Sequence, residues 1–194
     1  MATYRVKIEG TAPLLMHNGA LADPLNPTVR AMKKLTGKKT KKTDDDIIEL
    51  ARLEFVGGLY LDDTGAPCIT SSMLQGMMVN GAADQRKGKD FTADVSCPDD
   101  TYPLIYTGPK TADELWDHGD FVHTVGVKVA KARVMRTRPK FKKWAVEFTV
   151  KIAPHASVSA ESLLDAITIA GQRKGIGDFR PRFGRFTVTH FSKV

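Results

Sequence analysis

The chain has 194 residues, of which 42% are hydrophobic, and its formal net charge is +7 at pH 7. This length and apolar content suit one domain with a substantial core, and the excess of positive charge favours an acidic partner. The sequence has no run of roughly 18 apolar residues, as a membrane-spanning helix needs, and it begins without the apolar core of an export signal. We therefore expect a cytoplasmic protein with no membrane partner.

The two cysteines, Cys68 and Cys97, are too few and too isolated for a disulfide framework or a zinc site. We expect both to be free thiols. The histidines show no metal-ligand spacing, so the sequence predicts no structural metal and no cofactor.

The first predicted element is a strand near the N-terminus, because apolar residues alternate there with polar ones. These apolar residues are Tyr4, Val6 and Ile8. Residues 18–42 contain an Asp-Pro pair, an Asn-Pro pair and six lysines, which predict a mobile cationic loop. Thr43 then predicts the N-cap of a helix that ends at Gly57 and Gly58, with three aspartates in its first turn.

The middle of the chain predicts a short hairpin at residues 59–69. Thr70 or Ser71 is placed to cap a following helix, whose apolar residues recur at helical spacing. Residues 84–117 are rich in turn-forming residues and predict no definite element. Two strand-like runs, residues 122–136 and 144–152, are predicted to pair with each other through a basic connection at residues 138–143.

Ser159 predicts the cap of a final helix that ends at Gly171, and residues 186–191 predict the last strand. When residues 18–66 are treated as an insertion, the remaining order is strand, helix, strand, strand, helix, strand. This order predicts an α+β fold of the ferredoxin-like (RRM-like) βαββαβ type, with an antiparallel sheet. We expect one domain over residues 1–194.

Positive charge is concentrated in two segments. Residues 127–151 contain nine cationic side chains and one acidic one, Glu147. Residues 173–185, between the last helix and the last strand, contain five cationic side chains among Gly175, Gly177 and Gly184. Glycine lets a backbone approach a ligand closely, and guanidinium groups bind phosphate oxygens in a planar fork. The two segments together predict a polyanion-binding face.

Three sequence patterns follow one another along the chain. They are a strand followed by small turn residues (4–19), a hairpin followed by a capped helix (66–82), and the glycine-arginine loop before the last strand (175–186). Together they resemble the RAMP superfamily, RRM-like proteins that process CRISPR RNA or coat it as backbone subunits of CRISPR effector complexes. The resemblance is greatest to a backbone-type subunit. The arrangement is also similar to stand-alone members encoded by phages and prophages, for which the cytoplasm would be that of the bacterial host.

This resemblance implies roles for three regions. It implies that the loop from Gly175 to Gly184 lies close to a nucleic-acid backbone, and that the helix start at Ser71 and Ser72 faces phosphates. It also implies that residues 133–146 form a projecting basic hairpin, or thumb. CRISPR effector subunits are further candidate partners on the same ground.

The predicted nucleic-acid contacts are cationic or polar residues of these segments. They are His17, Lys38, Lys39, Lys41, Lys42, Ser71, Ser72, Gln75, Arg86, Lys87, Arg133, Arg136, Arg138, Lys140, Lys142, Lys143, Arg173, Lys174, Gly175, Gly177, Arg180, Arg182 and Arg185. Alternate strand positions point the same way, so Arg136 and Arg138 are expected to line one groove. The alternative is an edge strand whose cations prevent aggregation. The lysines of residues 33–42 either contact phosphates or solvate a loop, and Phe141 and Trp144 are expected in the core.

The leading hypothesis is a non-enzymatic protein that coats single-stranded RNA or DNA through its sugar-phosphate backbone, as a head-to-tail oligomer. One alternative is a metal-independent endoribonuclease that uses His17 as general base. Asp23 is a loose parallel to the catalytic aspartate of some backbone subunits. Another alternative is an interaction protein that imitates or blocks a CRISPR backbone subunit.

Overall fold

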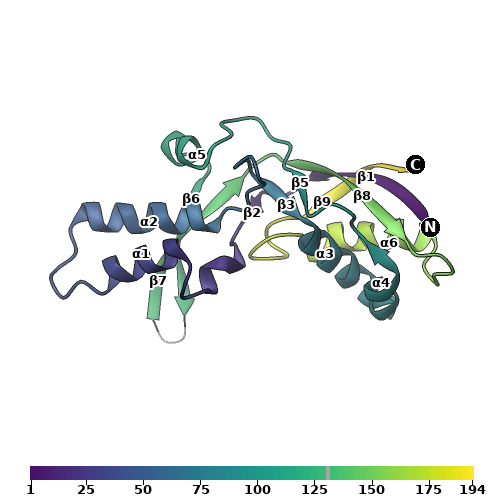
Figure 1. The fold of residues 1–194 in the computed structure, drawn as a ribbon, viewed down its shortest axis with the longest axis horizontal. Helices are drawn as coiled ribbons and strands as arrows, with labels where there is room; N and C mark the ends of the chain where they lie inside the picture. Colours follow the sequence, from purple (N-terminus) through teal and green to yellow (C-terminus); the bar gives the residue numbers. More distant parts are fainter. Residues whose placement is uncertain (130–131) are drawn as a thin grey trace.

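The computed structural model describes residues 1–129 and 132–194 and shows an α+β protein with antiparallel sheets (Figure 1). Its strands are β1 (Ala2–Gly10), β2 (Leu14–Leu15), β3 (Cys68–Thr70), β4 (Val95–Ser96), β5 (Thr101–Pro103), β6 (Val122–Val129), β7 (Ala132–Phe141), β8 (Ala145–Ile152) and β9 (Phe186–Lys193). Its helices are the 3-10 turn η1 (Gly19–Ala22), α1 (Pro27–Thr36), α2 (Asp44–Gly58), α3 (Ser71–Ala83), α4 (Gly88–Asp94), α5 (Ala112–His118), α6 (Ala160–Ile169) and the π-helical turn η2 (Ala170–Lys174). Among the described residues, no helix combines the length and apolar character that crossing a bilayer requires.

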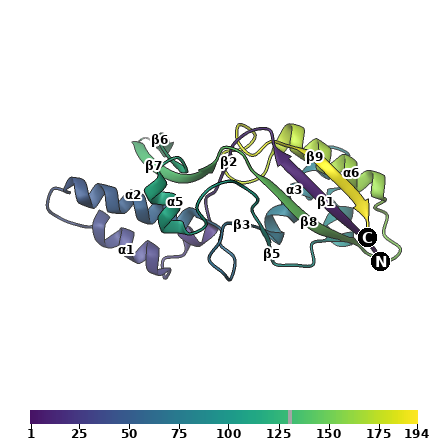
Figure 2. The same cartoon turned by 90° about the horizontal axis from the view of Figure 1, so that it is seen from above.

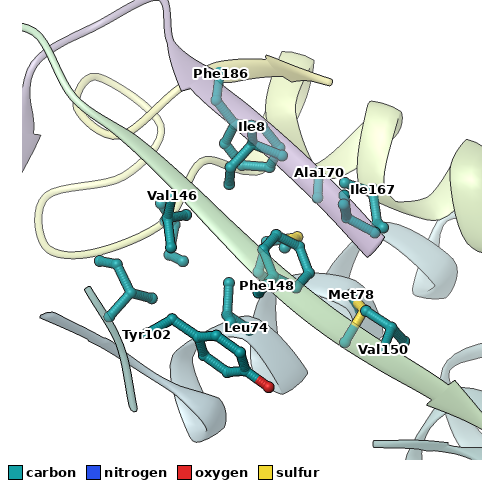
Figure 3. Packing of buried hydrophobic residues seen from close by; sticks show 14 of the residues in the cluster. Ile8, Leu74, Met78, Tyr102, Val146, Phe148, Val150, Ile167, Ala170 and Phe186 are labelled. Atoms are coloured by element: carbon teal, nitrogen blue, oxygen red, sulfur yellow. The ribbon is translucent and has the colours of Figure 1, made fainter. Parts of the chain in front are cut away.

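A four-stranded antiparallel sheet in the order β4-β8-β1-β9 forms one end of the molecule. β1 is an inner strand, and its Val6 pairs with Phe148 on β8 and with Phe191 on β9. The alternation that predicted this strand is confirmed, since Tyr4, Val6 and Ile8 are buried. α3 and α6 pack on one face of the sheet (Figure 3). The core side chains at this face include Ile8, Leu74, Met78, Phe148 and Ile167.

The other end contains a three-stranded sheet, β2-β7-β6, together with α1 and α2 (Figures 1 and 2). α2 packs against β7, where the buried carboxylate of Glu54 accepts two hydrogen bonds, each 2.8 Å long. The donors are the guanidinium of Arg136 and the backbone N–H of Thr137. The segment between η2 and β9, residues 175–185, lies between the two ends (Figure 2).

The expectation of a loop over residues 18–42 is wrong, because this segment contains η1 and α1. The Asn26 side chain accepts hydrogen bonds from the N–H groups of Thr28 (2.9 Å) and Val29 (3.4 Å), and Pro27 occupies the first helical position. Asparagine is a favourable N-cap residue. Proline is tolerated in the first turn of a helix because a backbone N–H at that position would have no acceptor within the helix. The Asn-Pro pair therefore starts a helix here.

The predicted pairing of residues 122–136 with residues 144–152 is also wrong. β6 pairs with β7 instead, while β8 pairs with β1 in the other sheet. The expected basic connection at residues 138–143 lies largely within β7, and the expected thumb at residues 133–146 is replaced by a β6–β7 hairpin. Residues 130–131, which include Lys131 of the basic run, lie outside the described part of the chain.

The cations of β7 have partners that the local sequence pattern does not reveal. Arg136 Nη1 lies 2.8 Å from Glu54 Oε1, and Arg138 Nε lies 2.6 Å from Asp178 Oδ2. Glu54 is separated from Arg136 by 82 positions in the sequence. A cation-rich run can occupy a strand between other elements when distant carboxylates neutralise it.

The predicted helix starts are close to those observed. α2 begins after the cap Thr43, and α3 is capped by Thr70 and not by Ser71. Both caps use a side-chain oxygen that accepts a hydrogen bond from an N–H group in the first turn, which is a short-range signal. Residues 84–117, for which no definite element was predicted, contain α4, β4, β5 and α5.

The predicted hairpin at residues 59–69 is confirmed by an antiparallel bridge between Leu61 and Pro67. The last helix extends farther than predicted. It continues past Gly171 through η2, which ends at Lys174, and the cap residue Gly175 follows with a φ of 72°. A positive φ of this kind favours glycine over residues that carry a Cβ.

Candidate nucleic-acid interface

The glycine-arginine loop, residues 175–185, is folded against the chain's own backbone. Asp178 N–H donates to the carbonyl of Leu15 at 2.8 Å, and Ile176 N–H donates to the carbonyl of Gly184 at 2.9 Å. Gly177 and Gly184 have φ values of 83° and 73°, and a Cβ on Gly184 would collide with the Ile176 carbonyl group. The glycines therefore let the loop pack on itself and on β2. The sequence had suggested close approach to a ligand instead.

Three cavities adjoin this loop, and a fourth shares the wall residue His17 with one of them; together they form what we name the loop belt. The helix-start cavity, of about 230 Å³, is lined by residues that include His17, Tyr60, Ser72, Asn80, Asp178 and Arg180. The outer cavity, of about 480 Å³, is lined by residues that include Asn80, Arg173, Lys174, Gly177, Phe179 and Arg180. The hairpin cavity, of about 460 Å³, is lined by residues that include His123, Lys128, Arg138, Phe179, Arg182 and Phe183. The arm cavity, of about 240 Å³, is lined by residues that include His17, Lys33, Glu54 and Arg136.

Shared wall residues connect these cavities. His17 belongs to both the arm cavity and the helix-start cavity. Arg180 belongs to both the helix-start cavity and the outer cavity, and Phe179 to both the outer cavity and the hairpin cavity. The loop belt therefore runs from α2, past the start of α3, to the β6–β7 hairpin.

The loop belt is strongly positive. Its walls carry eight cationic side chains, Lys33, Lys128, Arg136, Arg138, Arg173, Lys174, Arg180 and Arg182, against two acidic ones, Glu54 and Asp178. Both acids are already paired with arginines of β7. Arg180 and Arg182 are exposed, and neither forms an ion pair with another described residue. Such an excess of positive charge in adjoining hollows attracts a polyanion.

Arg136 and Arg138 line two different cavities of the loop belt and not the single groove that their alternation predicts. Arg136 lies in the arm cavity and Arg138 in the hairpin cavity. Each side chain is directed by its own carboxylate, from α2 in one case and from the glycine-arginine loop in the other. The two arginines thus tie β7 to both neighbouring elements.

The cations at the end of the last helix share one carboxylate. Lys174 Nζ lies 2.8 Å from Asp84, and Arg173 Nη1 lies 3.8 Å from it. Exposed ion pairs of this kind contribute about 0–1 kcal/mol, so a phosphate can compete for either cation. Both remain candidate contacts in the outer cavity.

Three predicted contact residues are engaged within the fold. Gln75 Nε2 donates to the carbonyl of Val95 at 2.6 Å, Lys87 Nζ donates to Ser162 Oγ at 3.0 Å, and Lys142 Nζ lies 3.5 Å from a carboxylate oxygen of Asp120. Gln75 thereby holds the end of α4 against α3. The structure gives each of these side chains a local partner outside the loop belt.

The other predicted contacts are divided between the loop belt and more distant surfaces. Gly175 is buried at the base of the loop, and Ser71 donates its backbone N–H to the carbonyl of Asp100. Nine further cations that were predicted as contacts line none of the four cavities: Lys38, Lys39, Lys41, Lys42, Arg86, Arg133, Lys140, Lys143 and Arg185. Phe141 and Trp144 are buried, as predicted.

Of the two residues named for catalysis, only His17 lies in the loop belt. Its backbone carbonyl accepts a hydrogen bond from Tyr60 Oη at 3.2 Å, and within the described chain no hydrogen bond links its ring to another side chain. Asp23 accepts the N–H of Leu25 at 2.8 Å in the turn before α1 and lines none of the four cavities. Asp178 shares the helix-start cavity with His17, but it is paired with Arg138.

Sequence reasoning missed the aromatic part of the loop belt. Phe179 and Phe183 lie in the glycine-arginine loop with ring centroids 6.2 Å apart, and the His123 ring is 5.7 Å from Phe183. Burial lowers the pKa of His123, and the neighbouring Lys140, Arg138 and Arg182 lower it further. The sequence did contain a signal for this aromatic part, because two phenylalanines are interleaved with arginines in the predicted loop. Exposed aromatic residues beside cations are typical of proteins that bind single-stranded nucleic acid.

The open face of the four-stranded sheet has a different character. Arg5 pairs with Glu147 at 3.5 Å, and Lys7 pairs with Glu9 at 3.1 Å. This face presents mixed, mutually paired charge. In the walls of the loop belt, by contrast, cationic side chains outnumber acidic ones.

The cysteines are free in the structure, and burial raises the pKa of Cys68 to about 11 and that of Cys97 to about 12. Both are protonated thiols at neutral pH and poor nucleophiles. Over residues 1–129 and 132–194, no group of three or more His, Cys, Asp or Glu side chains is arranged to hold a metal ion.

The loop belt is thus defined by charge, by shape and by one aromatic pair, and these properties are the basis for assigning a function. No protein-family model matches this chain, and no curated protein shows significant sequence similarity to it.

Proposed function

We propose that this protein binds single-stranded nucleic acid, RNA or DNA, mainly through the sugar-phosphate backbone, without catalysing a reaction. The observation that carries the proposal is the loop belt, whose walls hold eight cations and two acids. Four of these cations already have carboxylate partners, and the exposed Arg180 and Arg182 pair with no other described residue. Phosphate contacts dominate the affinity of proteins for nucleic acids and carry little sequence information. We further propose that copies coat the strand head to tail.

The proposal extends to the fold family. The sheet order β4-β8-β1-β9 with α3 and α6 on one face is the order that a ferredoxin-like βαββαβ unit produces. The glycine-arginine loop lies between η2 and β9, where the RAMP resemblance places it. We propose that the protein is a RAMP-type, backbone-like subunit, with α1, α2 and the β6–β7 hairpin as elaborations of the unit.

Salt-dependent binding tests this function. Fluorescence anisotropy with labelled single-stranded RNA and DNA of several sequences should give a log affinity that falls linearly with log salt, by about 0.7 for each neutralised phosphate. Arg180→Ala and Arg182→Ala should each weaken binding to every sequence alike and make the slope shallower.

Arg5→Ala is the matched control, because it removes an exposed arginine on the open face of the sheet. It should leave the affinity and the slope unchanged. A slope near zero, or equal losses from Arg5→Ala and Arg180→Ala, would contradict backbone binding by the loop belt.

One observation favours a second function, a metal-independent endoribonuclease. His17 shares the helix-start cavity with Arg180 and the Tyr60 hydroxyl, so a ribose 2′-hydroxyl bound there would meet both a base and a cation. Incubating labelled RNA and its 2′-deoxy counterpart with EDTA separates the two functions. Cleavage of RNA alone that is lost in His17→Ala would establish the enzyme, and intact RNA supports binding only.

A further inference from the structure

We propose that the hairpin cavity receives an unstacked nucleobase of the bound strand. This inference rests on the proposed function and deepens it, because it assigns a base-binding part to a surface otherwise argued to bind phosphates. The cavity lies between the β6–β7 hairpin and the glycine-arginine loop. Its volume of about 460 Å³ falls in the range of about 300–1,000 Å³ that is typical of small-ligand pockets.

The aromatic wall of this cavity is open to a ligand. Phe179 is 50% exposed and has a φ of 56°, a left-handed conformation that bulky residues rarely adopt. The plane of the Phe183 ring makes an angle of 65° with that of the Phe179 ring, and the buried Leu15 side chain adds an aliphatic part to the cavity wall. An exposed phenylalanine held in this way presents a ring face on which a planar base can stack.

The polar wall suits a base that is attached to phosphates. Arg182 lies over the Phe183 ring with its guanidinium carbon 5.9 Å from the ring centroid, and Lys128 and Arg138 complete the cationic side. The described residues that line the cavity include no acidic side chain, although Asp178 meets Arg138 at its edge. A cationic and aromatic cavity of this kind is complementary to an aromatic ring that belongs to a polyanion.

His123 adds a hydrogen-bonding group. Its lowered pKa keeps the ring neutral at pH 7, so one ring nitrogen donates and the other accepts. The charged groups that face it are Arg138, Lys140 and Arg182. A neutral imidazole can bond to a donor or to an acceptor on a base edge, which favours a cavity with little base selectivity.

The position of the cavity is consistent with this role. Phe179 is a wall of both the hairpin cavity and the outer cavity, where Arg173, Lys174 and Arg180 lie. A strand whose phosphates follow the outer cavity would therefore have a base beside Phe179. An acidic peptide would use the cations but leave the ring faces without a planar partner.

The test compares normal oligonucleotides with abasic chains of the same length and charge, in both RNA and DNA. The wild-type protein should bind the base-bearing chain tighter, by on the order of tenfold. Phe179→Ala should lose this advantage while keeping its affinity for the abasic chain, and Phe179→Tyr should retain it. Phe183→Leu is a second variant that reduces the same wall, and Leu25→Ala is a control at an exposed apolar residue outside the cavity.

Three outcomes would overturn the inference. If the wild type binds normal and abasic chains equally, the base contributes nothing and only the phosphate-binding function stands. If Phe179→Ala weakens both chains alike, the ring supports the loop and does not contact a base. If neither chain binds, the proposed function fails as well. In that case, a change in oligomeric state caused by Phe179→Ala in the absence of nucleic acid would assign the aromatic wall to a contact between protein copies.

Discussion

Gly184 occupies a position that other residues do not tolerate. Its φ is 73°, and a Cβ there would meet the Ile176 carbonyl, whereas Gly65 has a φ of 81° with open space around it. Both Gly65→Ala and Gly184→Ala should lose about 1 kcal/mol of unfolding free energy through backbone strain. Gly184→Ala should lose roughly 1–3 kcal/mol more, because the loop must move to relieve the overlap. Urea denaturation of the two variants measures the difference, and equal losses would show that the loop adapts freely.

His123 makes stability depend on pH in a defined direction. Its pKa in the folded protein is lowered from 6.5, first by burial and then by Lys140, Arg138 and Arg182. The folded state therefore disfavours the protonated ring relative to the unfolded chain. The associated stability is fully present above about pH 6.5 and is lost as the pH falls through the lower folded-state pKa.

His123→Gln should remove this part of the pH dependence. Thermal denaturation between neutral and mildly acidic pH measures it, and NMR titration of the ring measures the pKa directly. A His123 pKa at or above 6.5 would contradict the burial and the charge environment that the structure gives this residue.

At the scale of elements, the glycine-arginine loop is held to β7 by the ion pair between Asp178 and Arg138. The Arg138 side chain is only 12% exposed, so loss of its partner leaves a largely buried charge. Asp178→Asn should therefore loosen the loop and speed hydrogen–deuterium exchange at the N–H groups of Ile176 and Gly184. Asp113→Asn is the control, because it breaks an exposed ion pair of the same 2.6 Å length. Equal protection of the loop in both variants would show that backbone hydrogen bonds alone hold it.

Elements with a short-range signal were predictable, and those that depend on distant partners were not. The caps Thr43 and Thr70 and the alternation in β1 lie within a few residues of the structure that they specify. The strand character of β7 depends on Glu54 and Asp178, which no local pattern connects to Arg136 and Arg138. Sequence reasoning therefore located the cationic segments but assigned β7 the wrong partner strand.

The same distinction applies to the candidate site. His17, Ser72, Gly177 and Arg180 were proposed from three separate segments, and the structure brings all four to the helix-start cavity. The lysines after α1 were proposed on charge alone and lie outside the loop belt. Charge density identifies positively charged segments, but the packing of the loop decides which of them share a cavity.

For the whole molecule, the distribution of charge predicts how assembly depends on nucleic acid. Copies that repel one another through the positive loop belt should associate along a strand only when its phosphates neutralise that charge. Size-exclusion chromatography after nuclease treatment should give a smaller species, and added single-stranded oligonucleotide should restore a larger one that high salt dissociates. Oligomers that persist without nucleic acid would show that contacts between protein copies dominate, as expected for an interaction protein.

The two tryptophans of the chain lie in different parts of the fold. Trp144 is buried against Phe186 beside the four-stranded sheet, and its indole N–H donates to the carbonyl of Ala12 at 2.9 Å. Trp116 on α5 contacts Phe55 of α2, with ring centroids 5.5 Å apart. Trp116 thus reports on the packing of α5 against α2, and Trp144 reports on the four-stranded sheet. Emission spectra of Trp116→Phe and Trp144→Phe during heating would reveal whether the α2–α5 contact and the four-stranded sheet melt in a single cooperative step.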